Sequence, residues 1–266
     1  MTKQTSNKYA AILSEIFRAH YKKGVDSFEF LRPELEATAT KLGITLPKNL
    51  GDLIYSFRFR TAMPNDIATT ASKGREWIIE LAGTAKYRFR LAKINRIVPR
   101  ENQYEIKIPD ATPEIIRRHA LTDEQALLAI VRYNRLIDIF LGVTAYSLQN
   151  HLRTNIPGVG QTETDEVYVA VRQTGEQFVV PVQAKGGNDQ LGAVQLRQDL
   201  ALCTHVFSHL TCRLVAVQFK KAEDVIVMFE VTLQGDELKV LEERHYRLVP
   251  AGDITSEDLE TMRRLK

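Results

Sequence analysis

The sequence predicts an α+β protein with two domains: a helical N-terminal domain that ends in a β-hairpin, and a mixed α/β domain after it. Apolar side chains recur at helical spacing over the first 60 residues, and two strand-like runs follow them. In the second half, β-branched runs alternate with helical segments. A length of 266 residues, with 44% hydrophobic and 26% charged residues, is ordinary for a globular chain with two cores.

Composition excludes a membrane-spanning chain. No apolar run approaches the ~20 residues that cross a bilayer, and the N-terminal Met-Thr-Lys-Gln-Thr-Ser has no apolar signal core, so a cytoplasmic location without a membrane partner is expected. The two cysteines do not make a disulfide framework, and reduced thiols are expected. Cys203, His205, His209 and Cys212 are zinc-ligand types, but their spacing matches no common zinc knuckle, so buried thiols and helix-end histidines are the preferred interpretation.

The N-terminal domain is expected over residues 1–100. A first helix over 7–22 starts at Asn7, a second runs from Pro33 to Gly43, and a third begins near Pro47. Two strands are expected at 77–81 and 87–91. Three short helices followed by a β-hairpin are the order of a winged helix, and segment 47–60 resembles a winged-helix segment seen fused to nucleases.

The formal net charge of +3 conceals an asymmetry. Between Lys41 and Arg100 there are 12 Lys or Arg and 4 Asp or Glu, a balance of +8, so the remainder sums to −5. A solvated basic face and a phosphate-binding face both explain such a segment. As DNA-binding residues we expect Lys48, Asn49, Arg58 and Arg60 on the third helix, in the major groove, and Lys86, Arg88 and Arg90 on one strand face.

Residues 101–120 are expected to be a connector with prolines and one short strand, and residues 121–266 the second domain. A long helix is predicted from Thr122 to about Arg153, with Gly142 as a break and Asp138 as a surface acid. The expected order continues with a helix at 191–206 and strands at 214–219, 225–233 and 238–248, the last at an edge. It ends with a terminal helix at 256–265.

A β-hairpin with polar ends is the centre of the second domain. The apolar runs 167–171 and 178–182 flank a Thr-Gly-Glu-Gln turn. Gln183 and Lys185 share a strand face, because side chains alternate along a strand. A two-residue turn pairs Glu166 with Lys185, whereas a longer turn or a bulge brings Asp165 there instead. Glu163 shares the face of Asp165 and is a candidate auxiliary acid.

This pattern, Asp165 followed by Gln183-Ala184-Lys185, resembles the PD-(D/E)xK superfamily of nucleases, which includes many restriction endonucleases. Gln183 departs from the usual Glu, although some relatives use Gln-x-Lys. The resemblance implies a restriction-endonuclease-like mixed sheet flanked by helices. It also implies a Mg²⁺ site, with Mn²⁺ as an alternative, held by Asp165, Gln183 and the Ala184 carbonyl, with Lys185 orienting water or stabilising phosphoryl charge.

The expected function is therefore a Mg²⁺-dependent endonuclease for double-stranded DNA, of the restriction type. The resemblance leaves open a repair, junction-resolving or methyl-directed nuclease, and a non-catalytic winged-helix regulator. Asp165 together with Lys185 favours the enzyme, because a regulator has no use for that pair. Cutting two strands implies two sites, so a homodimer is expected by the same resemblance.

Overall fold

In a computed structural model of the chain, the structure describes residues 3–47, 50–59, 61–93, 96–119, 124–157, 159–186, 191–220, 224–234 and 237–264. The chain divides into two compact units. Unit 1 comprises residues 1–95 and 155–161, and unit 2 comprises 96–154 and 162–266. None of the helices in these described ranges is long and apolar enough to cross a membrane.

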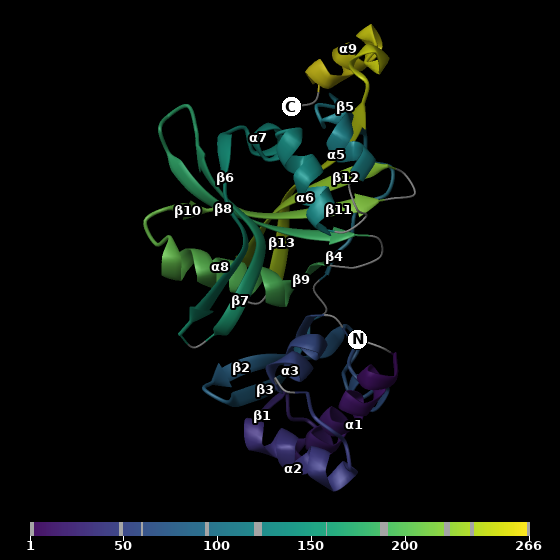
Figure 1. The fold of residues 1–266 in the computed structure, drawn as a ribbon, viewed down its shortest axis with the longest axis vertical. Helices are drawn as coiled ribbons and strands as arrows, with labels where there is room; N and C mark the ends of the chain where they lie inside the picture. The colour runs from purple at the N-terminus through teal and green to yellow at the C-terminus, as the bar shows by residue number, and fades with distance from the viewer. Residues whose placement is uncertain are drawn as a thin grey trace. The chain divides into compact units, whose positions relative to one another are not determined.

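Unit 1 is a small α+β unit in which four helices precede the last two strands of a three-stranded antiparallel sheet, with strand order β1-β3-β2 (Figure 1). Its core is aromatic: the rings of Phe17, Phe28, Trp77 and Phe89 pack with centroids 5.1 to 5.7 Å apart. Its elements are α1 (Lys3–His20), β1 (Ser27–Leu31), α2 (Arg32–Leu42), α3 (Leu50–Phe59), α4 (Asn65–Ala68), β2 (Arg75–Gly83) and β3 (Lys86–Lys93).

Two details of unit 1 differ from the sequence expectation. Helix α1 begins at Lys3, so Asn7 lies inside the helix and is not its cap. Strand β1 was not predicted, because five residues directly before a proline-started helix give too short a pattern; it pairs with β3 from Ser27–Arg90 to Leu31–Lys86. The end of α2 is as predicted, with Gly43 in the left-handed conformation at φ 63°.

Unit 2 is built on a mixed eight-stranded sheet. Seven of its strands follow the order β5-β13-β12-β11-β8-β7-β6, and the eighth, β10, pairs with β8. β8 pairs antiparallel with β7 and parallel with β11, so the predicted hairpin lies inside the sheet. The strands are β5 (Glu105–Pro109), β6 (Thr144–Ile156), β7 (Gly160–Val171), β8 (Gln177–Gly186), β10 (Thr211–Cys212), β11 (Leu214–Lys220), β12 (Val225–Gln234) and β13 (Glu237–Val249); β4 (Arg96–Ile97) pairs separately with β9 (Leu191–Gly192). The helices are α5 (Glu114–His119), α6 (Glu124–Tyr133), α7 (Leu136–Leu141), α8 (Ala193–Val206) and α9 (Ser256–Arg264), with a 3₁₀ turn at Ala251–Asp253.

The prediction of one long helix over 122–153 is wrong. Helix α6 ends at Tyr133 and α7 at Leu141, with Arg135 and Gly142 both at positive φ (51° and 63°). The chain then forms the strand β6 from Thr144. Gly142 therefore ends the helix instead of bending it, since it adopts the left-handed cap conformation.

The predicted connector is part of unit 2. β5, which lies in residues 101–120, pairs parallel with β13 from His245–Glu105 to Val249–Pro109. β13 was expected at the edge of the sheet, but it lies between β12 and β5. The division between the two units falls at residues 95 and 96 instead of at 100.

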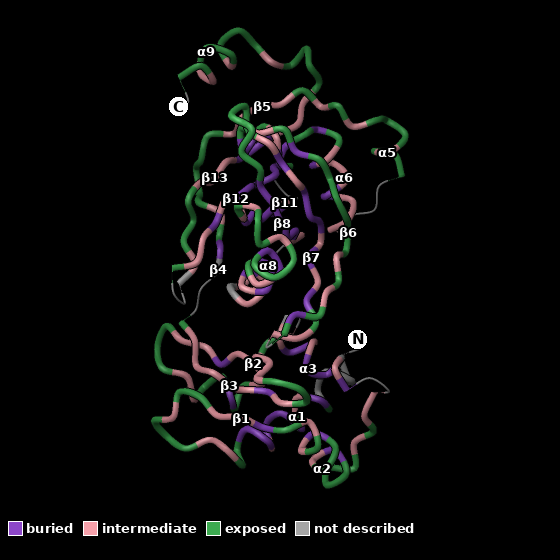
Figure 2. The backbone as a smooth tube through the Cα atoms, turned by 90° about the vertical axis from the view of Figure 1, so that its left-hand side faces the viewer, coloured by how far each residue is buried: buried purple, intermediate pink, exposed green. Residues whose placement is uncertain are grey.

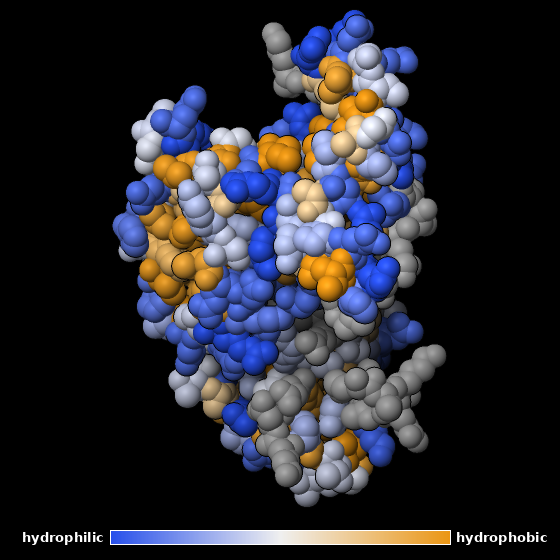
Figure 3. Space-filling view, turned by 45° about the horizontal axis from the view of Figure 1, so that its top comes forward, coloured by the Kyte–Doolittle hydropathy of each residue, from blue (hydrophilic) through white to orange (hydrophobic). Residues whose placement is uncertain are grey.

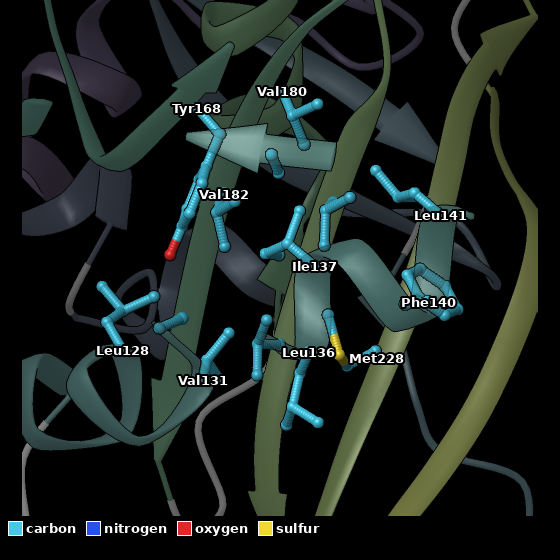
Figure 4. Close-up of a cluster of buried hydrophobic side chains, with 14 of the residues drawn as sticks. Leu128, Val131, Leu136, Ile137, Phe140, Leu141, Tyr168, Val180, Val182 and Met228 are labelled. Carbon is cyan, nitrogen blue, oxygen red and sulfur yellow. The ribbon is translucent and has the colours of Figure 1, made fainter. Parts of the chain in front are cut away.

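Helices pack on both faces of the central strands β7, β8, β11 and β12, where the buried residues concentrate, whereas β6 is largely exposed (Figure 2). On one face α6 and α7 pack against β7, β8 and β12, through side chains that include Leu128, Ile137, Tyr168, Val182 and Met228 (Figure 4). On the opposite face, Leu196 of α8 packs with Leu214, Ala216 and Val227. The face seen in Figure 3 carries both hydrophilic areas and apolar patches.

Candidate functional site

The β7–β8 hairpin has a different register from the one that a two-residue turn would give. Glu166 pairs with Val182 and Val171 with Gln177, so residues 172–176 make the turn. Arg172 N–H donates to the Glu176 carbonyl at 2.9 Å, which closes this five-residue loop. Glu166 is consequently not opposite Lys185.

Strand β7 changes face at Asp165. Thr164 contacts Asp199 of α8, whereas Glu166 contacts Arg132 of α6, on the other side of the sheet. Residues two apart in a regular strand share a face, so the backbone is irregular between them. The effect is that three successive residues, Thr164, Asp165 and Glu166, enter three different environments.

Asp165 lies in the site with Lys185. Its Oδ2 accepts the Ala184 N–H at 2.9 Å. Burial raises the pKa of Asp165, the Ala184 N–H and the charge of Lys185 oppose that rise, and the charge of Glu124 adds to it. The carboxylate is therefore costly to ionise without a further cation.

Gln183 and Asp199 form a buried polar cluster with Thr164. Asp199 Oδ1 accepts the Thr164 hydroxyl at 2.6 Å and the Gln183 amide Nε2–H at 3.1 Å. The same Gln183 amide donates to the Glu163 carbonyl at 3.4 Å. All three side chains are at most 2% exposed. Burial raises the pKa of Asp199 to about 7, even though the Thr164 and Gln183 hydrogen bonds lower it.

This cluster is incomplete. Gln183 Oε1 and Asp199 Oδ2 are buried and have no hydrogen-bond partner within the described ranges. Because both amide hydrogens of Gln183 point toward acceptors, its oxygen is oriented away from them. Unpaired buried oxygens cost free energy, and hard oxygen donors of this kind are ligands for Mg²⁺ or Mn²⁺.

Lys185 is held by an acid from another element. Its Nζ donates to Glu124 Oε1 at 2.9 Å, and its side chain is 13% exposed. Glu124 is the first residue of α6. The helix preceding the hairpin thus contributes an acid, but that acid is Glu124 and not Asp138. Asp138 accepts the Ala145 N–H at 3.0 Å and pairs with Arg135.

Glu166, the alternative acid, forms its hydrogen bonds with Arg132 and Ser147 and not with Lys185. It is fully buried, and its Oε1 accepts from Arg132 Nε at 2.8 Å and from the Ser147 hydroxyl at 2.6 Å. Glu163 is near the site but also paired: its Oε1 lies 3.2 Å from His151 Nδ1 and 3.2 Å from an Arg153 nitrogen. Burial works against its charge, yet Arg153 and His151 hold the pKa of Glu163 below its usual value.

The described side chains do not assemble a metal centre from acids, histidines and cysteines alone: no three of them are grouped to hold an ion. The zinc-type residues are separated in exposure, with Cys203 buried and both His205 and His209 exposed. A hydrogen bond with Cys212 and burial raise the pKa of Cys203. The oxygen donors at Asp165 are of two kinds: the carboxylates of Asp165 and Asp199, and the amide oxygen of Gln183.

The expected DNA-binding residues are partly described. Lys48, Asn49 and Arg60 lie outside the described residues, and burial lowers the pKa of the Arg58 guanidinium. Lys86 and Arg88 share Glu29 of β1, with Arg88 at 2.7 Å. Arg90 binds Glu80 of β2 at 2.6 and 3.0 Å. These cations do line one side of β3, as predicted, but carboxylates of neighbouring strands pair with them.

Comparisons with protein-family models, with curated proteins and with solved structures gave no match. The geometry of the site therefore carries the functional argument. Sequence reasoning had missed Glu124, Asp199, Thr164 and His151. Asp199 lies in α8, fourteen positions after Lys185, and a single acid in an amphipathic helix gives no signal by itself.

Proposed function

We propose that this chain is a metal-dependent endonuclease that hydrolyses phosphodiester bonds of double-stranded DNA, of the restriction type. The observation that carries the proposal is the convergence of Asp165, Gln183 and Asp199 next to Lys185, with two buried oxygens that lack partners in the described structure. An acid, a neutral oxygen and an ammonium at one sheet position suit a cation and a phosphate.

The donor set fits Mg²⁺ or Mn²⁺. Asp165 would bind the cation through a carboxylate oxygen, Gln183 through Oε1, and the Ala184 carbonyl and Asp199 would complete the donor set. When bound, the ion would lower the pKa of a coordinated water and neutralise charge on the phosphoryl group. Its positive charge would also offset the cost of ionising Asp165 and Asp199, whose pKa values burial raises.

Lys185 supplies the fixed positive charge of the site. Its ion pair with Glu124 orients the ammonium and keeps it partly shielded from water. From this position the ammonium would orient the attacking water or stabilise the charge of the pentacovalent phosphoryl group. Asp199, which accepts from the Thr164 hydroxyl, and the Glu163 carbonyl both accept from the Gln183 amide, so that the Gln183 oxygen would be directed toward the cation.

Unit 1 would read the DNA as a winged helix. The order α1, β1, α2, α3, β2, β3, with the four-residue helix α4 inserted before β2, and the sheet order β1-β3-β2 support that assignment, as does the +8 balance over residues 41–100. In this proposal α3 and the residues on both sides of it, with Lys48, Asn49, Arg58 and Arg60, meet the major groove. Two cuts on two strands would be made by a homodimer.

The test is cleavage of methylated and unmethylated plasmid by the full chain, with Mg²⁺, with Mn²⁺ and with EDTA. Asp165→Asn should reduce cleavage by about 10²–10³-fold or more and leave DNA binding intact. Asp138→Asn is the matched control, because Asp138 also accepts a backbone N–H but pairs with Arg135.

Full cleavage in EDTA would exclude the metal mechanism. DNA binding without cleavage of any plasmid would favour a non-catalytic regulator, and cleavage of methylated plasmid alone a methyl-directed nuclease.

A further inference from the structure

His151 has an unusual backbone for its position. It lies in the middle of strand β6, and its φ is +48°, a left-handed conformation that side-chain-bearing residues seldom adopt. Such strain persists where the surroundings hold it, and it concentrates at functional sites. In a strand it acts as a bulge does, and redirects one side chain.

The redirected imidazole meets an acid. His151 Nδ1 lies 3.2 Å from Glu163 Oε1, on the neighbouring strand β7. With Nδ1–H donated to that carboxylate, the orientation of the ring is fixed and Nε2 is the atom left for another partner. The side chain is 49% exposed, so Nε2 is open to a substrate. A carboxylate that orients a histidine is the arrangement found in general acid–base catalysis.

The imidazole is also close enough to the proposed cation site to affect it. Burial raises the pKa of Asp165, and the charge of His151 opposes that rise to a smaller extent than the Ala184 N–H and Lys185 do. Glu163 connects the two places, because its carboxylate holds His151 while its carbonyl accepts from Gln183. Arg153, bound to the same carboxylate, adds a second positive charge beside the ring.

We infer that His151, oriented by Glu163, is the general acid that protonates the leaving oxygen during phosphodiester hydrolysis. This inference rests on the proposed function. In the step, the oxygen of water forms a bond to phosphorus and releases its proton to solvent. The bond from phosphorus to the leaving oxygen breaks, its electron pair stays on that oxygen, and the oxygen takes the proton from Nε2. Solvent then returns a proton to the imidazole.

The test compares two leaving groups. After the wild-type cut site is mapped on plasmid, two duplexes are made, one natural and one with sulfur replacing the leaving oxygen at the scissile bond. A thiolate leaves without protonation, so it does not need the acid. His151→Asn should slow the natural duplex by about 10²–10⁴-fold and the sulfur duplex by no more than a few-fold. Asn tolerates the left-handed backbone and can still bind Glu163, so the fold is kept.

Two further variants make the result specific. His151→Gly has no strain at this φ, and added imidazole should restore cleavage of the natural duplex only. Arg153→Ala shares the strand and the partner Glu163 but carries no transferable proton, so it should slow both duplexes equally. If His151→Asn slows cleavage of both duplexes equally, or slows neither, the inference is overturned. The proposed nuclease function would still stand. A wild type that cleaves no plasmid with Mg²⁺ or with Mn²⁺ would overturn the proposed function, and this inference with it.

Discussion

Two buried acids flank Asp165, one on each face of the sheet, and their surroundings differ. Glu166 and Asp199 are 0% and 1% exposed. Each has one oxygen that accepts two hydrogen bonds and one without a hydrogen-bond partner in the described residues. Glu166 has a cation, Arg132, at 2.8 Å. Asp199 has only neutral donors, Thr164 and Gln183, among the residues that the structure describes.

The difference supports the proposed roles of the two acids, Glu166 in packing and Asp199 at the cation site. A buried carboxylate next to an arginine is already compensated, and it contributes to a rigid packing arrangement. A buried carboxylate with only neutral donors is not compensated, and its pKa rises to about 7. The protein keeps this uncompensated acid next to Asp165 and Lys185. A missing positive charge at this place is what a cation-binding site requires.

The largest expected effect is the pH dependence of stability from Asp199. Its folded pKa of about 7 lies above the ordinary aspartate value of ~3.9, so its favourable contribution is complete below about pH 4 and is lost as pH rises through 7. At ~1.4 kcal/mol per pKa unit, the loss is at most about 4 kcal/mol. Asp199→Asn should flatten this dependence.

Hydrogen exchange of β8 peptides between pH 4.5 and 8 measures that dependence, and the fluorescence of Trp77, the single tryptophan, monitors unit 1 as a control. Added Mg²⁺ should protect β8 in the wild type above pH 7, and Asp199→Asn should need about tenfold more Mg²⁺ for the same protection. An equally steep pH dependence in both proteins would show that Asp199 is compensated after all.

The next largest effect comes from removing Arg132, the cation that pairs with the buried Glu166. Arg132→Met keeps the apolar stem but leaves Glu166 buried without its charge partner. Breaking a fully buried pair costs ~3–5 kcal/mol, and because Arg132 is 37% exposed we expect about 2–3 kcal/mol of lost stability. Arg153→Ala, in an exposed pair with Glu163, should cost less than about 1 kcal/mol. Urea unfolding followed by far-UV circular dichroism measures both, and equal losses would remove the distinction between the clusters.

A third prediction exchanges charge between Gln183 and Asp199. Gln183→Glu alone places two carboxylates in contact, which cannot both ionise easily, so Mn²⁺ affinity should not improve. Asp199→Asn alone should weaken Mn²⁺ binding about tenfold, equal to ~1.4 kcal/mol. The double variant keeps the total charge and should bind within a few-fold of the wild type. Calorimetric titration with Mn²⁺ measures all four proteins; a tighter Gln183→Glu single variant would show that Asp199 does not act on position 183.

The sequence predicted the parts of this site that depend on local order. The hairpin, the strands after it and the α8 helix follow from apolar runs and turn residues, and Asp165 with Gln183 and Lys185 follows from their place at the ends of those runs. The choice between Asp165 and Glu166 remained open, because a strand irregularity decides it and irregularities leave no periodic signal.

The rest required tertiary structure. Glu124 is 61 residues from Lys185 and Asp199 is 35 from Thr164, distances over which pattern reasoning has no reach. The strand β6 was read as helix because its exposed residues, from Tyr146 to His151, show no alternation between buried and exposed positions. Its misassignment also concealed His151, whose role depends on lying beside Glu163.

The smallest expected effect extends the comparison to a half-buried acid of unit 1, Glu29. Glu29 binds both Lys86 and Arg88, whose hydrogen bonds lower its pKa, so these two cations are partly neutralised in the free protein. If the β3 face meets phosphates, Glu29→Gln should release both cations for DNA. Each added phosphate contact steepens the dependence of log affinity on log salt by ~0.9, so the slope should increase by about 1–2.

Fluorescence anisotropy of the full chain with a mixed-sequence duplex, at several salt concentrations, measures the slope. Glu15→Gln is the matched control, because Glu15 also binds two cations, Arg18 and Lys41, but on α1. A steeper slope for Glu15→Gln and not for Glu29→Gln would place the phosphate-binding face on α1 instead of on β3.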